Sequence, residues 1–469
     1  MHKKILTLLI TGLLLATGCT NKNVPLNNSN VLLENRTLNH TRAAIGLDEL
    51  PAVVSGTKQF PATAPANPIP NPSPHAIPSN PAHPGYFVGL ALSGGGSRSA
   101  NFSAAVMLQL QRIGMLKHVD FISSVSGGSL TGAYYCATAD DQWTPEKVQH
   151  KLSGAFANHS MLKFLLPWNL IATAVSDYDR SDLLAETFEH ELFTANGHAL
   201  TFGDLRPDRP KLLINATELQ SGKKFIFCNE TFDELNSDLA KYPLAWACTA
   251  SAAVPVVLHQ VTLRDFSTDF AQYRHFIDGG IADNLGIVSL VETYDLHNRT
   301  AEAHGQPSPY PNGAVFIVID ARTRFNADLS SKGDISFLES LKFGSGLVST
   351  ALLSRASTAT LAELIVKYSP DTTTAAELRK NIADLHDSGF LKTEDVKHRP
   401  IYIVHFALSY TSQLDQVPFQ NFSQSLDSIS TYFNIDPTDA YHLYEAAELL
   451  MKQKYEPMFK PVLEKLEKR

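Results

Sequence analysis

Three short segments of this 469-residue chain combine residue types that could do chemistry with the glycines that would expose them. They read SGGGSR at residues 93–98, SVSGG at residues 124–128 and DGG at residues 278–280. Each follows an apolar stretch typical of a buried strand. Together they hold a hydroxyl, a carboxyl and a run of backbone amides, which are the parts needed for acyl transfer through a serine.

Ser126 is the candidate nucleophile because it lies in a predicted strand-to-helix turn. Residues 124–128 fit the G-x-S-x-G elbow except that Ser124 replaces the first glycine. The elbow needs small residues two places before and two places after the serine, and Ser124 and Gly128 meet that requirement. At a helix start, the alkoxide would also lie at the positive end of the dipole. Ser-Gly-Gly also occurs in ordinary turns, so the other two segments are needed for the assignment.

The glycines of the first segment predict a cradle of backbone amides. Gly94, Gly95 and Gly96 lie between a strand and a helix, where consecutive N–H groups can converge on one oxygen. A phosphate-binding loop is the competing interpretation, but the G-x-G-x-x-G pattern is imperfect and no Gly-Lys-Ser/Thr follows. A purely structural turn is the other alternative. Arg98 either fixes this loop or approaches an anionic head group.

Asp278 is the candidate base. It lies at the end of a short apolar strand and before two glycines, placed to accept a proton from a hydroxyl across a gap. A carboxylate is a weak base for a serine, so water must be partly excluded to raise its pKa. The apolar neighbours Phe276, Ile277 and Ile281 are consistent with that requirement.

Taken together, the three segments resemble the patatin-like phospholipases, over roughly Gly85 to Tyr410. Further agreement comes from the small-residue stretch ending in proline at residues 250–255. The resemblance implies two-step hydrolysis of a lipid ester by a Ser–Asp dyad, without cofactor or metal. It places the functional residues as follows: nucleophile Ser126, base Asp278, oxyanion loop Gly94, Gly95, Gly96 and Arg98, elbow Ser124 and Gly128. Ser93 departs from the aspartate that often precedes the glycines in the family.

Three alternatives stay open at this point. A Ser–His–Asp esterase would need a histidine base, with His259 and His275 just before Asp278 and six further histidines after it. An acyltransferase could use the same residues with an acceptor other than water. A membrane-anchored scaffold could keep the fold without turnover.

The surrounding elements predict an α/β fold. Continuous apolar stretches typical of central strands lie at residues 87–92, 119–125, 211–216, 314–320 and 400–406. Helical patterns at residues 99–113 and 130–137 follow the first two strands, which favours a mainly parallel sheet with right-handed crossovers. With the resemblance, this predicts a patatin-like three-layer α/β/α sandwich with a helical insertion and C-terminal helices. Two apolar helical stretches, residues 161–172 and 347–368, are either packed on the core or form a lid.

Four regions are expected along the chain. They are a lipoprotein signal peptide at residues 1–18, an acylated N-terminus and Pro-rich tether at 19–85, the acyl-hydrolase domain at 86–410, and a C-terminal helical extension packed on it at 411–469. Cys19 follows a basic and apolar leader and resembles the acylated cysteine of a bacterial lipobox. Because Thr20 is not an aspartate, the outer membrane is the expected destination. An ordinary signal peptide with a chance cysteine is the alternative, and part of the tether could lie along the domain surface.

Composition limits the partners. The net charge of −8 without a basic stripe argues against nucleic acid as a partner. The expected substrate, a membrane lipid or lipid ester, is what the family resemblance implies. The cysteines form no C-x-x-C pair, so zinc is not expected. Beyond Cys19, the remaining Cys136, Cys228 and Cys248 form at most one disulfide or are three buried thiols. No calcium-ligand spacing is evident, and we expect no metal dependence.

Overall fold

The computed structural model describes residues 25–28, 73–78, 85–155, 179–255, 258–268, 270–323, 356–368, 375–429 and 435–467. The leader, Cys19 and the predicted lid stretch at residues 161–172 lie outside them, as do residues 347–355 of the second stretch. Its remaining part, residues 356–367, is helical.

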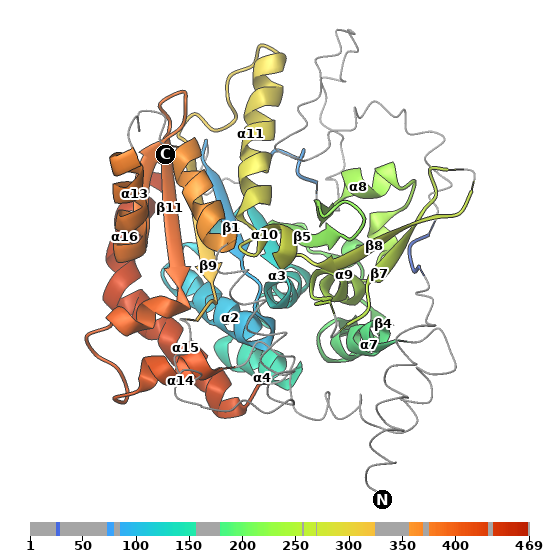
Figure 1. Cartoon of the computed structure of the whole chain (residues 1–469), viewed down its shortest axis with the longest axis horizontal. Coiled ribbons are helices and arrows are strands. Elements are labelled where there is room, and N and C mark those ends of the chain that lie inside the picture. The colour runs from blue at the N-terminus through green and yellow to red at the C-terminus, as the bar shows by residue number, and fades with distance from the viewer. Residues whose placement is uncertain are drawn as a thin grey trace, which may run out of the picture.

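A nine-stranded sheet forms the centre of the molecule (Figure 1). In spatial order, its strands are β10 (Phe390–Glu394), β11 (Pro400–Ala407), β9 (Ala314–Asp320), β1 (Phe87–Leu92), β2 (Phe121–Val125), β5 (Lys211–Glu218), β8 (Gln272–Asp278) and β7 (Val261–Asp265), with β6 (Lys224–Phe227) paired to β5. The five strands from β11 to β5 run parallel, and the remaining pairs are antiparallel. The prediction of a mainly parallel sheet is therefore confirmed.

Helices cover both faces of this sheet, which explains why its central strands are apolar throughout. In β1, Leu90 and Leu92 belong to one core, while Phe87 and Ala91 belong to the other. The helices contributing to the first core include α2 (Gly96–Arg112), α3 (Gly127–Ala137), α4 (Pro145–Ala155), α7 (Arg180–Leu192), α9 (Leu244–Ser251), α15 (Pro437–Leu450) and α16 (Glu456–Leu466). The second core is built with α11 (Ile287–Ala303), α13 (Ala375–Ser388) and the helix at residues 356–367. The predicted α/β/α sandwich is confirmed.

Shorter elements complete the described chain. They are the 3₁₀ turns at Leu116–His118, Phe202–Asp204, Leu239–Lys241 and Leu408–Gln413, the small β3 (Thr194–Ala195) and β4 (His198–Ala199) pair, α8 (Asn229–Glu234), α10 (Gly280–Asp283), α14 (Phe422–Ser428) and the π-helical segment Met451–Tyr455. Cys136, Cys228 and Cys248 are free and buried. Across the ranges that the structure describes, no helix has the combined length and apolar character that crossing a bilayer requires.

The C-terminal helices pack against α2, the helix that follows the glycine loop. The α15 helix lies along α2 and shares its apolar core. At the π-helical segment, the Tyr455 ring stacks on Phe406 with centroids 4.0 Å apart, and its hydroxyl donates to the His405 carbonyl at 2.6 Å. The C-terminal extension thus packs against α2 and β11.

Two pieces of the proline-rich N-terminal region lie on the domain surface. The Asn27 side chain is buried against β7, and Ser73 donates a hydrogen bond to Glu230 at the start of α8. The Pro74 carbonyl lies 2.5 Å from Nε2 of His297. In these two stretches the chain follows the domain instead of standing away from it.

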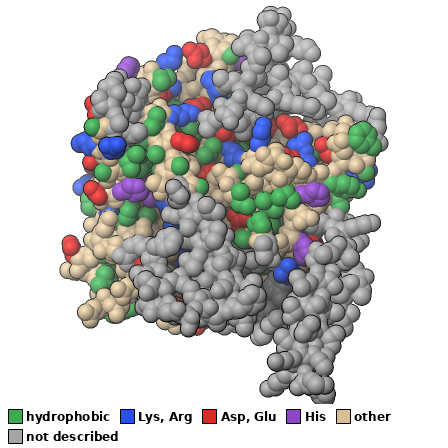
Figure 2. Space-filling model, viewed as in Figure 1, with side chains coloured by type: hydrophobic (Ala, Val, Ile, Leu, Met, Phe, Trp, Pro, Cys, Tyr) green, Lys and Arg blue, Asp and Glu red, His purple; other side chains and the backbone are tan. Residues whose placement is uncertain are grey.

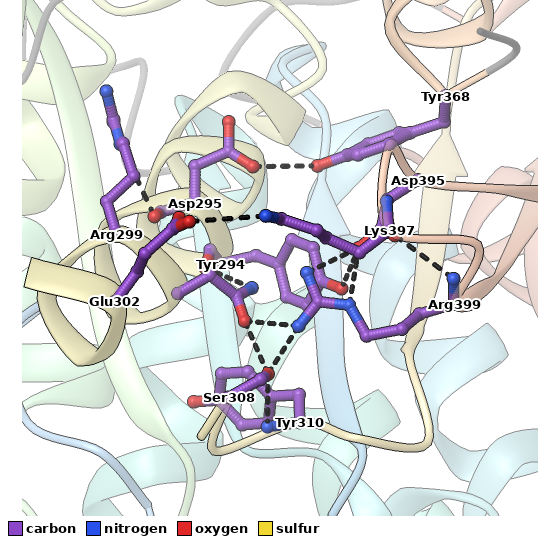
Figure 3. A network of polar contacts seen from close by, with 11 residues as sticks. Tyr294, Asp295, Arg299, Glu302, Ser308, Tyr310, Tyr368, Asp395, Lys397 and Arg399 are labelled. Atoms are coloured by element: carbon purple, nitrogen blue, oxygen red, sulfur yellow. Dashed lines mark hydrogen bonds and ion pairs between the residues drawn. The ribbon is translucent and has the colours of Figure 1, made fainter. Parts of the chain in front are cut away.

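A polar network fastens α11 to the turn between β10 and β11 (Figure 3). Asp395 in that turn accepts hydrogen bonds from the Tyr294 hydroxyl at 2.8 Å and from Nε of Arg399 at 2.7 Å. Lys397 in the same turn pairs with Glu302 at 3.2 Å. Because α11 begins nine residues after Asp278, this network fixes the helix into which the acid loop runs.

Candidate active site

Ser126 occupies a strained turn between β2 and α3. Its backbone has φ 52° and ψ −123°, a conformation that non-glycine residues rarely adopt. The side chain is 3% exposed. Such strain persists only where the surroundings enforce it, and a sharp strand-to-helix turn is the geometry that lifts a serine hydroxyl out of a sheet. The backbone at Ser126 therefore has the form that such a turn requires.

The glycine loop lies directly against this turn. A Cβ on Gly127 would come 1.9 Å from the Gly96 carbonyl oxygen, and a Cβ on Gly94 would lie 3.5 Å from the Cβ of Ser126. A Cβ on Gly128 would be 2.8 Å from the carbonyls that end β1. The two turns can touch only because these glycines carry no side chain. Ser124, two residues before Ser126, is a buried serine that the turn accommodates.

Two amides of the loop have no hydrogen-bond acceptor among the residues that the structure describes. Gly95, with φ 140°, is the N-cap of α2, and Gly96 is its first residue. The first N–H groups of a helix have no acceptor within the helix. The amide of Gly94 instead donates to the Asn284 carbonyl at 2.9 Å. Gly95 and Gly96 are thus the predicted glycines whose amides suit an oxyanion.

Asp278 ends β8 beside the serine. Its side chain is 6% exposed, and its Oδ1 accepts a hydrogen bond from the Gly280 amide at 2.7 Å. Burial raises the pKa of Asp278 to about 6, against the lowering effect of hydrogen bonds from the Gly280 amide and the Ser126 side chain. Ser126 and Asp278, which are far apart in sequence, therefore lie near enough for the serine side chain to act on the pKa of the carboxyl.

Arg98 holds the loop from the side of the C-terminal extension. Its Nε donates to the Ala321 carbonyl at 2.8 Å, and its Nη1 donates to the Ile429 carbonyl at 2.7 Å. Burial lowers its pKa to about 10, so it stays charged at neutral pH. Of its two predicted roles, these contacts favour fixing the loop over binding a head group.

Two residues that support the site were not predicted from the sequence. The Ser251 hydroxyl accepts the Ser126 amide at 2.8 Å and donates to the Asn215 carbonyl at 2.6 Å, while its own carbonyl accepts the Gly279 amide at 3.0 Å. The Asn215 side chain donates to the Ser124 carbonyl at 2.9 Å. Ser251 thus links the nucleophile turn to the acid turn, and Asn215 ties Ser251 and the nucleophile turn to β5. The sequence features that could have pointed to them are the polar Asn215 inside an apolar strand and Ser251 within the small-residue stretch at residues 250–255.

Replacing Ser251 by alanine tests this positioning role. Ser251→Ala leaves the buried Ser126 amide without an acceptor, which we expect to lower kcat for a soluble ester by about 10- to 100-fold with little change in KM. Ser129→Ala is the matched control, because it removes a hydroxyl 3.0 Å from that of Ser251 but leaves the acceptor of the Ser126 amide in place. Equal kcat in the two variants would remove Ser251 from the site.

Gly127→Ala tests the contact between the two turns. The added methyl would clash with the Gly96 carbonyl, so the turns must separate, and we expect activity to fall by at least about 100-fold. Gly222→Ala is the control, since a Cβ there meets nothing within 4 Å even though the φ of Gly222, +68°, is itself unfavourable for alanine. Steady-state rates for both variants, with unfolding temperatures, decide the matter; an active Gly127→Ala enzyme contradicts the close approach.

The histidines that could serve a Ser–His–Asp triad have other partners. His259 faces Asp179 at 4.0 Å, and Nδ1 of His275 lies 2.9 Å from the Thr262 hydroxyl. A buried Asp–His pair does exist, with Nε2 of His405 3.0 Å from Asp320. Its other nitrogen, Nδ1, contacts the Tyr410 hydroxyl at 2.9 Å, not a serine. This pair joins β9 to β11.

Within the described ranges, no group of three or more His, Cys, Asp or Glu side chains is arranged to hold a metal ion. The described part of the site offers a buried carboxyl, a serine in a strained turn and two backbone amides at the start of a helix.

Comparison with known proteins gives a family match over the region that contains this site. Residues 90–291 match the family model described as Patatin-like phospholipase. The search of curated proteins finds no match.

Among solved structures, human GIVD cytosolic phospholipase A2 is similar with a TM-score of 0.48 and 11% identity, covering 82% of this chain and 60% of that chain. The same human enzyme in complex with methyl gamma-linolenyl fluorophosphonate gives a TM-score of 0.40 and 13% identity, covering 81% of this chain and 58% of that chain. VipD from Legionella pneumophila gives 0.27 and 13%, covering 78% and 67%. The chain thus spans about 60% of the length of the human enzyme.

Proposed function

Because residues 90–291 match the family model of the patatin-like phospholipases, we propose that the protein hydrolyses lipid esters through a Ser126–Asp278 dyad. The observation that carries the proposal is that the Ser126 side chain lies near enough to the buried Asp278 carboxyl to lower its pKa, beside the amides of Gly95 and Gly96. A nucleophile, a base with a raised pKa and oxyanion donors in one place are the requirements of acyl transfer.

The proposed reaction has two steps. Asp278 takes the proton of the Ser126 hydroxyl as Oγ attacks the ester carbonyl, and the amides of Gly95 and Gly96 bind the oxyanion. When the C–O bond breaks, Asp278 returns the proton to the leaving alcohol, which leaves an acyl group on Ser126. Water then attacks this acyl group and gives a proton to Asp278, and the carboxylic acid departs as Ser126 regains its proton.

The raised pKa of Asp278 predicts the pH profile. The base must be ionised to act, so kcat/KM should fall about tenfold per pH unit below about 6 and level off above it. A histidine base would give a similar midpoint, but the pKa of a carboxyl barely changes with temperature whereas that of an imidazole does. Profiles of a soluble ester at two temperatures separate the two. A midpoint that moves strongly with temperature would contradict Asp278 as the base.

Fatty-acid release from lipid vesicles tests the function itself. The purified protein should release free fatty acid from phospholipid, lysophospholipid or neutral ester, and the preferred lipid follows from the relative rates. Transfer of the acyl group to an added alcohol without free acid would indicate an acyltransferase. Lipid binding with no ester cleavage would indicate a scaffold.

We also propose that the mature protein is held at the membrane, in the outer membrane, by acyl chains on Cys19. The support is the basic and apolar leader followed by Ala-Thr-Gly-Cys. Mass spectrometry of the N-terminal peptide would detect the lipid, and a Cys19→Ser variant should lack it.

A further inference from the structure

The N-terminal stretch Pro25–Asn28 is attached to the edge strand β7 through the Asn27 side chain. The Asn27 amide nitrogen donates to the Arg264 carbonyl at 2.8 Å, and its oxygen accepts the Arg264 amide at 2.8 Å. Ser237 donates to the Asn28 carbonyl at 2.8 Å and adds a second attachment. Asn27 is 5% exposed, so this stretch is built into the domain surface.

This attachment limits how the domain can stand on a membrane. Only five residues lie between Cys19 and Pro25, and an extended chain over this span reaches at most about 20 Å. A globular unit of several hundred residues is about 50 Å across. With Cys19 acylated, the bilayer must therefore lie near the β7 edge and not at the opposite side of the molecule.

The same edge carries exposed apolar side chains. Phe270, in the loop between β7 and β8, is 67% exposed, Tyr273 is 45% exposed and Leu219 is 50% exposed. Tyr273 pairs with Arg264 across the hairpin, and the Leu219 amide donates to the His275 carbonyl at 2.8 Å. Leu219 therefore lies opposite His275, and cross-strand partners share a face. His275 follows Tyr273 by two residues on β8 and lies on the same face, so Leu219 and Tyr273 share one face of the sheet. Figure 2 shows hydrophobic side chains gathered over this region, on the right of the view.

We propose that this hairpin patch, defined as Leu219, Phe270 and Tyr273, enters the surface of the lipid bilayer to which the protein is anchored. The proposal rests on the proposed acylation and lipid-ester function. Exposed aromatic side chains suit the boundary between head groups and acyl chains. A further exposed apolar residue, Ile281 at 48%, lies three residues after Asp278.

A lipid surface fits this edge better than a protein strand does. An edge strand can pair with another chain only through free backbone groups. At Arg264, both the amide and the carbonyl are already taken by Asn27. Tyr273 and Asp278 lie on the same strand five residues apart, or about 17 Å. Insertion of the hairpin would therefore bring the ester region of the lipids close to Ser126.

Tryptophan quenching tests the insertion directly. The full-length mature protein, inactivated by Ser126→Ala to keep the lipid intact, is placed in phosphatidylethanolamine–phosphatidylglycerol vesicles whose acyl chains are brominated. Phe270→Trp adds a fluorophore at the patch, and Tyr441→Trp adds one at a 56% exposed position on α15. We expect the added emission at position 270 to be quenched and that at position 441 to be retained. Equal quenching at the two positions, or stronger quenching at 441, would overturn the proposal.

A second measurement uses turnover of the same vesicle lipids. The double variant Phe270→Ser/Tyr273→Ser should hydrolyse them at least about tenfold more slowly, because it lacks the two aromatic side chains whose burial in the bilayer favours binding. Phe419→Ser/Tyr441→Ser removes the same two side-chain types from the C-terminal extension and should leave the rate unchanged. Equal rates for the two variants would count against the patch. If the wild-type protein cleaves no lipid, the proposed function fails while the quenching result still decides the insertion.

Discussion

Ser126→Ala is expected to lower the turnover of lipid esters by a factor on the order of 10⁵. The hydroxyl removed is the proposed attacking atom, and the amides of Gly95 and Gly96 can stabilise an oxyanion only after one forms. Binding should survive, because the methyl of alanine fits where the Cβ of serine already lies. Fatty-acid release at saturating substrate measures the effect.

Ser103→Ala is the matched control for this variant. Ser103 is a buried serine of α2 whose hydroxyl has no hydrogen-bond partner in the described part of the chain, so its loss should change neither rate nor fold. A Ser126→Ala protein that keeps more than about a hundredth of the wild-type rate would show that another residue is the nucleophile.

Asp278→Asn is expected to lower turnover by a factor on the order of 10⁴. The amide keeps the size of the carboxyl and can still accept the hydrogen bond from Gly280, but it cannot take the proton of Ser126. The loss should lie in kcat. Steady-state kinetics with a soluble ester measures it, and a variant that retains its rate would contradict the role of Asp278 as base.

The same substitution should make the protein more stable at neutral pH. The pKa of Asp278 is raised from 3.8 to about 6, so the folded state favours the protonated form. The stability that this gives is present below pH 3.8 and is lost as the pH rises through about 6. At pH 7.5 the buried carboxylate costs about 3 kcal/mol, and asparagine avoids this cost at any pH. Unfolding temperatures should therefore differ at pH 7.5 and converge near pH 4; a less stable variant at pH 7.5 would refute the raised pKa.

Much of the fold followed from local patterns in the sequence. The five continuous apolar stretches are strands of the central sheet, because helices on both faces demand apolar residues at successive positions. The antiparallel strands β7 and β8 were harder to predict. Outer positions such as Arg264 and Tyr273 are exposed, so their apolar residues do not form a continuous run.

The site was predictable where chemistry restricts residue type and not where it depends on distant packing. A strained serine, adjoining glycines and an aspartate before glycines leave recognisable patterns at Ser126 and Asp278. The side chains of Ser251 and Asn215 bind backbone atoms of the nucleophile turn, so their contribution is visible only once α9 and β5 lie beside that turn. Arg98 shows the converse, because its sequence position allowed two roles and its contacts with Ala321 and Ile429 come from parts of the chain over 200 residues away.

Fluorophosphonate labelling with peptide mapping is the most direct test that the alcohol and the acid act together. The wild-type protein should carry a single adduct, on the peptide containing Ser126, and Asp278→Asn should label far more slowly while His405→Ala, if folded, labels normally. An adduct on a different serine would contradict the dyad, as would equally fast labelling of wild-type protein and Asp278→Asn.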